Sequence, residues 1–323
     1  MEAHPARRFW CAAALLAWFA AAPVLANAAG YKTQNFVVSA PTPQLAKEIG
    51  DQAEHCRKQL ALEWLGKELP AWSQPCPIQA QVAPNLGAGG ATSFVFDRGQ
   101  VFGWRMTIQG SRERILDSVV PHEVTHTIFA THFRQPLPRW ADEGACTTVE
   151  HHSEIAKQDR MLIEFLQTRR GIPFSNMFAM EEYPQDVLPL YAQGYSLTKF
   201  LLDQGGKSAY IAFLEDGLGT GDWLAAVERA YGYSDLLTLQ STWLNWIQDG
   251  QPPVAAIASV SSGGDQAASG SGAVTLAAAS AGGGWQRPRR LSGVQVAASE
   301  ESQPRFDGPS VYDAARRTGS VLR

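Results

Sequence analysis

The stretch His122-Glu123-Val124-Thr125-His126 is the most informative part of the sequence for both fold and function. Side chains four residues apart on a helix leave the same face about one turn from each other, so both imidazoles can bind one metal ion. Histidine pairs of this kind suit zinc, and Glu123 lies beside the same face. The pentapeptide therefore predicts a helix that carries two zinc ligands and a carboxylate placed to act as a general base.

The run LPRWADEGA, residues 137–145, predicts a second helix. Pro138 suits a helix start, because the first turn does not need its backbone N–H. The intervening segment is long enough to turn and bring this helix back against the first, so that Glu143 faces both histidines as a third ligand. Three protein ligands leave one position for water, whose pKa zinc lowers to about 7. The predicted chemistry is hydrolysis with Glu123 as general base.

Together the two stretches resemble the gluzincin metallopeptidases, which include thermolysin and aminopeptidase N, and most closely the smaller peptidase MA-like proteins. In that pattern the HExxH helix is followed by a helix with a Glu-Gly pair, here Glu143-Gly144, whose glutamate is the third ligand. The resemblance implies a zinc cofactor, a peptide or protein substrate and a zincin-type fold. It covers roughly residues 31–250.

The segment YAQGYSL, residues 191–197, is similar to a Tyr-x-x-Gly helix start in relatives of aminopeptidase N. There the tyrosine hydroxyl donates a hydrogen bond to the oxyanion of the tetrahedral intermediate, so the resemblance implies this catalytic role for Tyr191. The alternative is that Tyr191 and Tyr195, one turn apart, form a packed aromatic pair. For Tyr195 we favour packing.

The sequence departs from aminopeptidase N at the predicted edge strand. The Gly-x-Met-Glu-Asn strand, whose glutamate captures the free amine of the substrate in that enzyme, is absent, and residues 89–96 contain no acidic side chain. This difference favours an endopeptidase over an aminopeptidase. A function of another class remains open, namely a zinc-stabilised module that binds a peptide or a cell-wall component without turnover.

Several side chains near Glu143 are additional candidates for the site. Glu150 falls on the same helix face as Glu143, where it can accept a hydrogen bond from the outer ring nitrogen of a ligating histidine, or it is a solvated charge. Cys146 is predicted to be a small buried helix residue, with ligation as a thiolate as the alternative. His151 and His152 point elsewhere on the helix, and extra metal ligation is the alternative for them.

Three regions differ in composition. Residues 1–28 resemble a signal peptide, with an arginine pair, an apolar run and an Ala-Asn-Ala cleavage site, and predict export to the periplasm or the exterior. No stable membrane span is expected after cleavage, and an uncleaved anchor is the alternative. Residues 251–323 are rich in Gly, Ser and Ala and predict a disordered tail. Residues 31–250 remain as the catalytic domain.

Within that domain, strand patterns precede helix patterns. Strands are predicted at 36–38, 77–82, 92–96 and 101–108. Helices are predicted at 44–65, then from a cap at Ser111 through the HExxH motif, then at 140–152, 154–168, 190–202, 208–214, 223–231 and 234–247. Pro121 implies a kink or a fresh helical start. This order predicts an α+β fold, in which a small antiparallel sheet packs on a helical lobe and the metal lies in the cleft between them.

Cysteine content and charge limit other interpretations. Cys11 leaves with the predicted signal peptide, and a disulfide between Cys56 and Cys76 would join a helix to a strand entry in an oxidising compartment. The formal net charge of −4 gives no reason to expect a nucleic-acid partner. The oligomeric state is left open.

Overall fold

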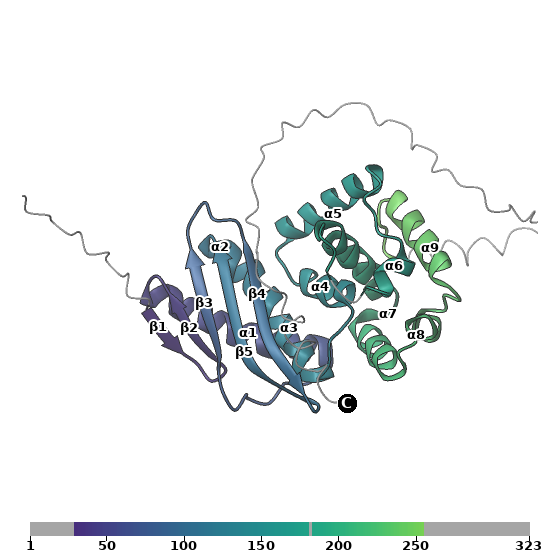
Figure 1. Ribbon diagram of the computed structural model, residues 1–323. Helices are drawn as coiled ribbons and strands as arrows, with labels where there is room; N and C mark the ends of the chain where they lie inside the picture. The colour runs from purple at the N-terminus through teal and green to yellow at the C-terminus, as the bar shows by residue number, and fades with distance from the viewer. Residues whose placement is uncertain (1–28, 181–182, 255–323) are drawn as a thin grey trace, which may run out of the picture.

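The computed structural model describes residues 29–180 and 183–254 (Figure 1). The predicted signal peptide, 1–28, and nearly all of the predicted tail, 251–323, lie outside the described residues. Within the described part, no helix has the length and apolar character that crossing a membrane requires.

Five strands form one open sheet in the order β1-β2-β3-β5-β4. Their bounds are β1 Ala29–Lys32, β2 Phe36–Ala40, β3 Cys76–Val82, β4 Gly89–Asp97 and β5 Gln100–Gly110. The α+β class is confirmed, but the sheet is mixed rather than antiparallel. β2, β3 and β5 run parallel, and the outer strands β1 and β4 pair antiparallel to their neighbours. The expectation was wrong on this point because helix α1, Pro43–Leu65, joins β2 to β3, and a helical crossover returns the chain in the same direction.

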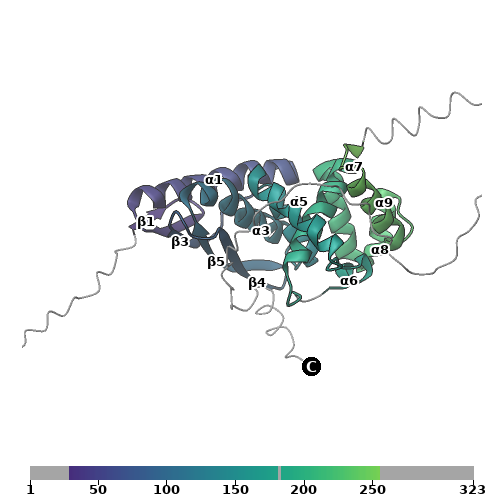
Figure 2. The same ribbon diagram turned by 90° about the horizontal axis from the view of Figure 1, so that it is seen from above.

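Helices α1 and α3 (Val120–Phe133) cover one face of the sheet (Figure 2). Helix α1 starts where the Thr42 side chain accepts a hydrogen bond from the Leu45 backbone N–H at 3.2 Å, and it ends at Gly66, whose φ of 68° suits glycine. The burial pattern of β2 alternates between buried and more exposed positions, so its inner side chains meet α1. The HExxH helix α3 thus packs beside α1 and against strands β4 and β5.

Helices α4 to α9 form a lobe in which α7 is the longest helix (Figure 1). Their bounds are α4 Arg139–Thr147, α5 His152–Gln167, α6 Phe174–Phe178, α7 Leu188–Thr220, α8 Trp223–Tyr231 and α9 Leu236–Gln248. Helix α7 contains a non-helical residue, Gly206 (φ 71°, ψ −179°), which separates the two helices expected at 190–202 and 208–214. Helix α6 and strand β1 were not predicted from the sequence.

Helices α4 and α7 cross closely at two glycines. A Cβ atom at Gly144 would collide with the Gly194 backbone, and a Cβ atom at Gly194 would lie 2.5 Å from the Trp140 carbonyl oxygen. Such an approach requires residues without side chains at both positions. Since Glu143 precedes Gly144 and Tyr191 lies one turn before Gly194, the crossing brings both side chains to the same region.

Gly194→Ala is expected to lower the free energy of unfolding by about 1–3 kcal/mol, because the added methyl group meets a backbone oxygen that cannot rotate away. Gly219→Ala is the matched control, since Gly219 lies in the part of α7 beyond Gly206 and no atom is within 4 Å of its added Cβ. The control is expected to be neutral or slightly stabilising. Urea unfolding measures the stability of both variants. Equal midpoints would show that α4 and α7 can move apart to accept the methyl group without loss of stability.

Candidate metal centre

The segment that leads into α3 places the first histidine one turn from the helix start. Ser111 caps the short helix α2, Arg112–Arg114, with its Oγ accepting from the Arg114 N–H at 3.3 Å. One π-helical turn follows, Ile115–Val119, and Pro121 then lies in the first turn of α3. Its missing N–H breaks no hydrogen bond at that position. The backbone at Val119 is α-helical (φ −67°, ψ −45°), so the helix continues through Pro121 by way of the π turn and does not start afresh there. Single π turns are frequent at functional sites.

The three predicted ligands converge between α3 and α4. Glu143 Oε2 lies 3.4 Å from His122 Nε2 and 3.7 Å from His126 Nε2. Donor atoms that share a tetrahedral zinc at about 2.0–2.2 Å are about 3.3–3.6 Å apart. The separations thus fit a zinc site with only small adjustment. The side chains of the three residues are at most 16% exposed, so the group is shielded from bulk water.

Each histidine directs its other ring nitrogen to a carboxylate. His122 Nδ1 is 2.7 Å from Glu150 Oε1, and His126 Nδ1 is 3.1 Å from Asp142 Oδ1. Such contacts hold the proton on Nδ1 and leave the Nε2 lone pair free for a metal. The sequence analysis proposed Glu150 for this position but missed Asp142, whose only signal was its place next to Glu143.

Cys146 contacts the same group from the outer side. Its Sγ is 3.3 Å from His126 Nδ1, the nitrogen that does not face Glu143. His122, His126 and Cys146 nevertheless offer ligand atoms within 4.8 Å of one another, which makes them a second possible donor set. Burial, with nearby carboxylates, holds the pKa of the Cys146 thiol well above its usual range. Glu143 Oε2 faces the Nε2 atoms of both histidines, whereas Cys146 Sγ faces His126 Nδ1, so we favour Glu143 as the third ligand.

Other predicted metal and redox candidates lie apart from this group. The rings of His151 and His152 contact each other at an interplanar angle of 48°, with centroids 3.9 Å apart. Neither residue belongs to the metal-compatible group found among the described residues. Cys56 and Cys76 are free, buried thiols, so the structure does not form the disulfide considered from the sequence. Burial raises the pKa of both thiols to about 12.

The edge strand β4 positions the Glu123 carboxylate. Thr92 Oγ1 donates to Glu123 Oε2 at 2.6 Å, and a Cβ atom added at Gly90 would lie only 2.5 Å from Glu123 Oε1. Burial raises the pKa of Glu123 above its usual range, and the nearby His126 and His122 offset this only in part. A carboxylate with a raised pKa is suited to take and return a proton near neutral pH. The expected edge strand is confirmed, since β4 is the outermost strand beside β5.

Gly90→Ala is expected to lower kcat by about 10- to 100-fold with zinc content retained, because the methyl group displaces the Glu123 carboxylate and small misplacements of reacting groups are costly. Gly30→Ala in β1 is the matched control, since no atom lies within 4 Å of its added Cβ. Steady-state kinetics and metal analysis of both variants test this. Unchanged kcat in Gly90→Ala would show that the position of Glu123 does not depend on β4.

Two tyrosines approach the ligands from the lobe. The Tyr183 hydroxyl donates to Glu143 Oε1 at 2.5 Å, and the Tyr183 ring centroid is 6.4 Å from that of Tyr191. Burial, with the negative charges of Glu143 and Glu123, raises the pKa of Tyr191 well above its usual range, so its hydroxyl stays protonated. Tyr195 is 3% exposed, in agreement with packing. The sequence analysis missed Tyr183, which lies between α6 and α7 and belongs to no motif.

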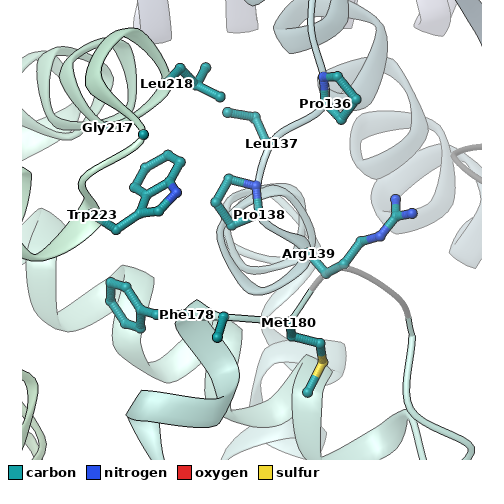
Figure 3. A pocket seen from close by; sticks show the side chains of 11 residues that line it. Pro136, Leu137, Pro138, Arg139, Phe178, Met180, Gly217, Leu218 and Trp223 are labelled. Atoms are coloured by element: carbon teal, nitrogen blue, oxygen red, sulfur yellow. The ribbon is translucent and has the colours of Figure 1, made fainter. Parts of the chain in front are cut away.

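A pocket of 340 Å³ lies near this centre but does not contain it (Figure 3). Most of its lining residues are apolar, among them Leu137, Pro138, Phe178 and Trp223. Arg139 also lines it, and its guanidinium carbon is 4.5 Å from the centre of the Tyr183 ring. Since no proposed ligand or base lines the pocket, we place the chemistry at the ligands.

No protein-family model matches the chain, and no curated protein sequence matches it. The function of this chain is therefore inferred from its residues and their geometry.

Proposed function

We propose that this chain is an exported zinc-dependent peptidase of the gluzincin type, close to the peptidase MA-like group. The observation that carries the proposal is the approach of His122 Nε2 and His126 Nε2 to one oxygen of Glu143. The buried Glu123 beside them adds the base that hydrolysis requires. The signal-like composition of residues 1–28 supports export.

The donor set fits zinc, and His122, His126 and Glu143 would hold it. Bound zinc supplies a water of lowered pKa and polarises a carbonyl group. Glu123 takes the proton of the attacking water and then returns it to the departing amine. The Tyr191 hydroxyl donates a hydrogen bond to the developing oxyanion. This hydrogen bond stabilises negative charge that the bound substrate does not yet carry.

Strand β4 is the proposed binding site for an extended peptide. Its outer edge has no neighbouring strand in the described residues. Backbone hydrogen bonds to such an edge bind an extended peptide with little dependence on the side chains of that peptide. No acidic side chain lies in residues 89–96 to capture a free amine. These features favour an endopeptidase.

A zinc-stabilised binding module is the alternative function. Such a module needs the three ligands, but it has no use for a buried carboxylate held by Thr92 and packed against Gly90. Burying a carboxylate disfavours its charged form, so a purely structural site has little reason to keep Glu123. The contacts of Glu123 therefore favour the enzyme.

Cleavage of a quenched fluorescent peptide library by the purified protein tests the function. We expect cleavage within the peptides, inhibition by phenanthroline and recovery when zinc is added back. Binding of peptides without cleavage, by protein that holds zinc, would support the binding module and exclude the peptidase.

A further inference from the structure

The contact between Tyr183 and Glu143 has no counterpart in the motifs that led to the proposed function. Tyr183 follows α6 in the chain, 40 residues from Glu143, and its hydroxyl donates to Glu143 Oε1 at 2.5 Å. The other oxygen, Oε2, is the one that lies 3.4 Å and 3.7 Å from the two histidine Nε2 atoms. The two carboxylate oxygens thus have different partners.

Neighbouring side chains hold the Tyr183 ring in place. The Arg139 guanidinium lies over one side, 4.5 Å from the ring centre, and a cation over an aromatic face is attracted to it. The Tyr191 ring is a further neighbour, with centroids 6.4 Å apart. Since Arg139 begins the helix that carries Glu143, the ring and the carboxylate are fixed to the same element.

We infer that Tyr183 is a positioning residue that holds Glu143 as a ligand through one oxygen only. With Oε1 occupied by the tyrosine hydroxyl, the carboxylate presents Oε2 alone to the histidines. A carboxylate that binds through both oxygens would occupy the position that an attacking water needs. Tyr183 therefore orients a ligand and keeps a coordination position open, a role separate from that of Tyr191. This inference rests on the proposed function, because it takes Glu143 as a zinc ligand.

Tyr183→Phe separates this role from a catalytic one, since it removes the hydroxyl and keeps the ring. Loss of a hydrogen-bonding partner to a metal ligand typically weakens metal binding about 10- to 100-fold. We expect a rise of that size in the zinc Kd, measured by competition with a zinc-binding dye. At saturating zinc we expect a lower kcat with little change in KM, because Glu143 Oε1, freed from the tyrosine hydroxyl, competes with the attacking water. After cobalt substitution, we expect weaker visible absorption than in the wild type, because absorption falls as the coordination number rises. Tyr233→Phe is the control, as it loses one tyrosine hydrogen bond, to Gln204 Oε1 at 3.0 Å, away from the site.

The possible failures are distinguishable. Equal zinc Kd values for Tyr183→Phe and the wild type, with equal thermal stability, would overturn the positioning role alone. A fall in kcat at unchanged zinc affinity would also overturn it and assign Tyr183 to the transition state. Failure of the wild-type protein to bind zinc at all would overturn the proposed function together with this inference.

Discussion

Glu123→Gln is expected to lower kcat by about 10²–10⁴-fold, because the amide keeps the shape of the side chain but cannot take a proton from water. Zinc content should be unchanged, since Glu123 is assigned as base and not as ligand. The Thr92 hydroxyl can still donate to the remaining amide oxygen, so the fold should be retained. Peptide-cleavage kinetics and metal analysis on the same preparation measure both properties.

Glu113→Gln is the matched control for this variant. Glu113 lies in the helical segment just before α3, and its side chain is 70% exposed. The control should keep full activity. Comparable turnover in Glu123→Gln and Glu113→Gln would exclude Glu123 as the base and with it the proposed mechanism.

Tyr191→Phe is expected to lower kcat by about 10²–10³-fold with little change in KM, because its hydroxyl is assigned to charge that develops only in the transition state. The ring stays, so zinc content and thermal stability should be unaffected. Tyr195→Phe, one turn further along α7, should be nearly silent for catalysis.

The two tyrosine variants also test the assignment of the motif. If Tyr195→Phe were the defective variant, the Tyr-x-x-Gly alignment would be wrong by one turn. If neither variant lost activity, the oxyanion would have to be stabilised by zinc and a donor other than Tyr191.

Local geometry explains how much of the site could be predicted. The i and i+4 spacing of His122 and His126 follows from helix geometry alone. Glu143 was assigned through the resemblance of Glu143-Gly144 to the gluzincin pattern, and a turn between two helices is enough to bring it to the histidines. Glu150 was also accessible, because it shares a helical face with Glu143. These residues lie within one short segment, where few chain conformations are compatible with the pattern.

The features that were missed depend on contacts between distant segments. Alternating side chains identified most strands, but not that β2, β3 and β5 run parallel, since strand direction is set by the connections between strands. Tyr183 belongs to no periodic element, and only the folded lobe brings it to Glu143. Gly90 is ordinary in sequence, and its significance appears only when the Glu123 carboxylate is seen against it.

Zinc content tests the ligand assignment most directly, with Glu143→Ala and Cys146→Ala compared in parallel with the wild type. We predict about one zinc per wild-type chain, loss of most of it in Glu143→Ala, and retention in Cys146→Ala. Both histidines are shared by the two possible donor sets, so the third ligand alone decides between them. Full occupancy in Glu143→Ala together with loss in Cys146→Ala would contradict the assignment and place zinc on His122, His126 and Cys146.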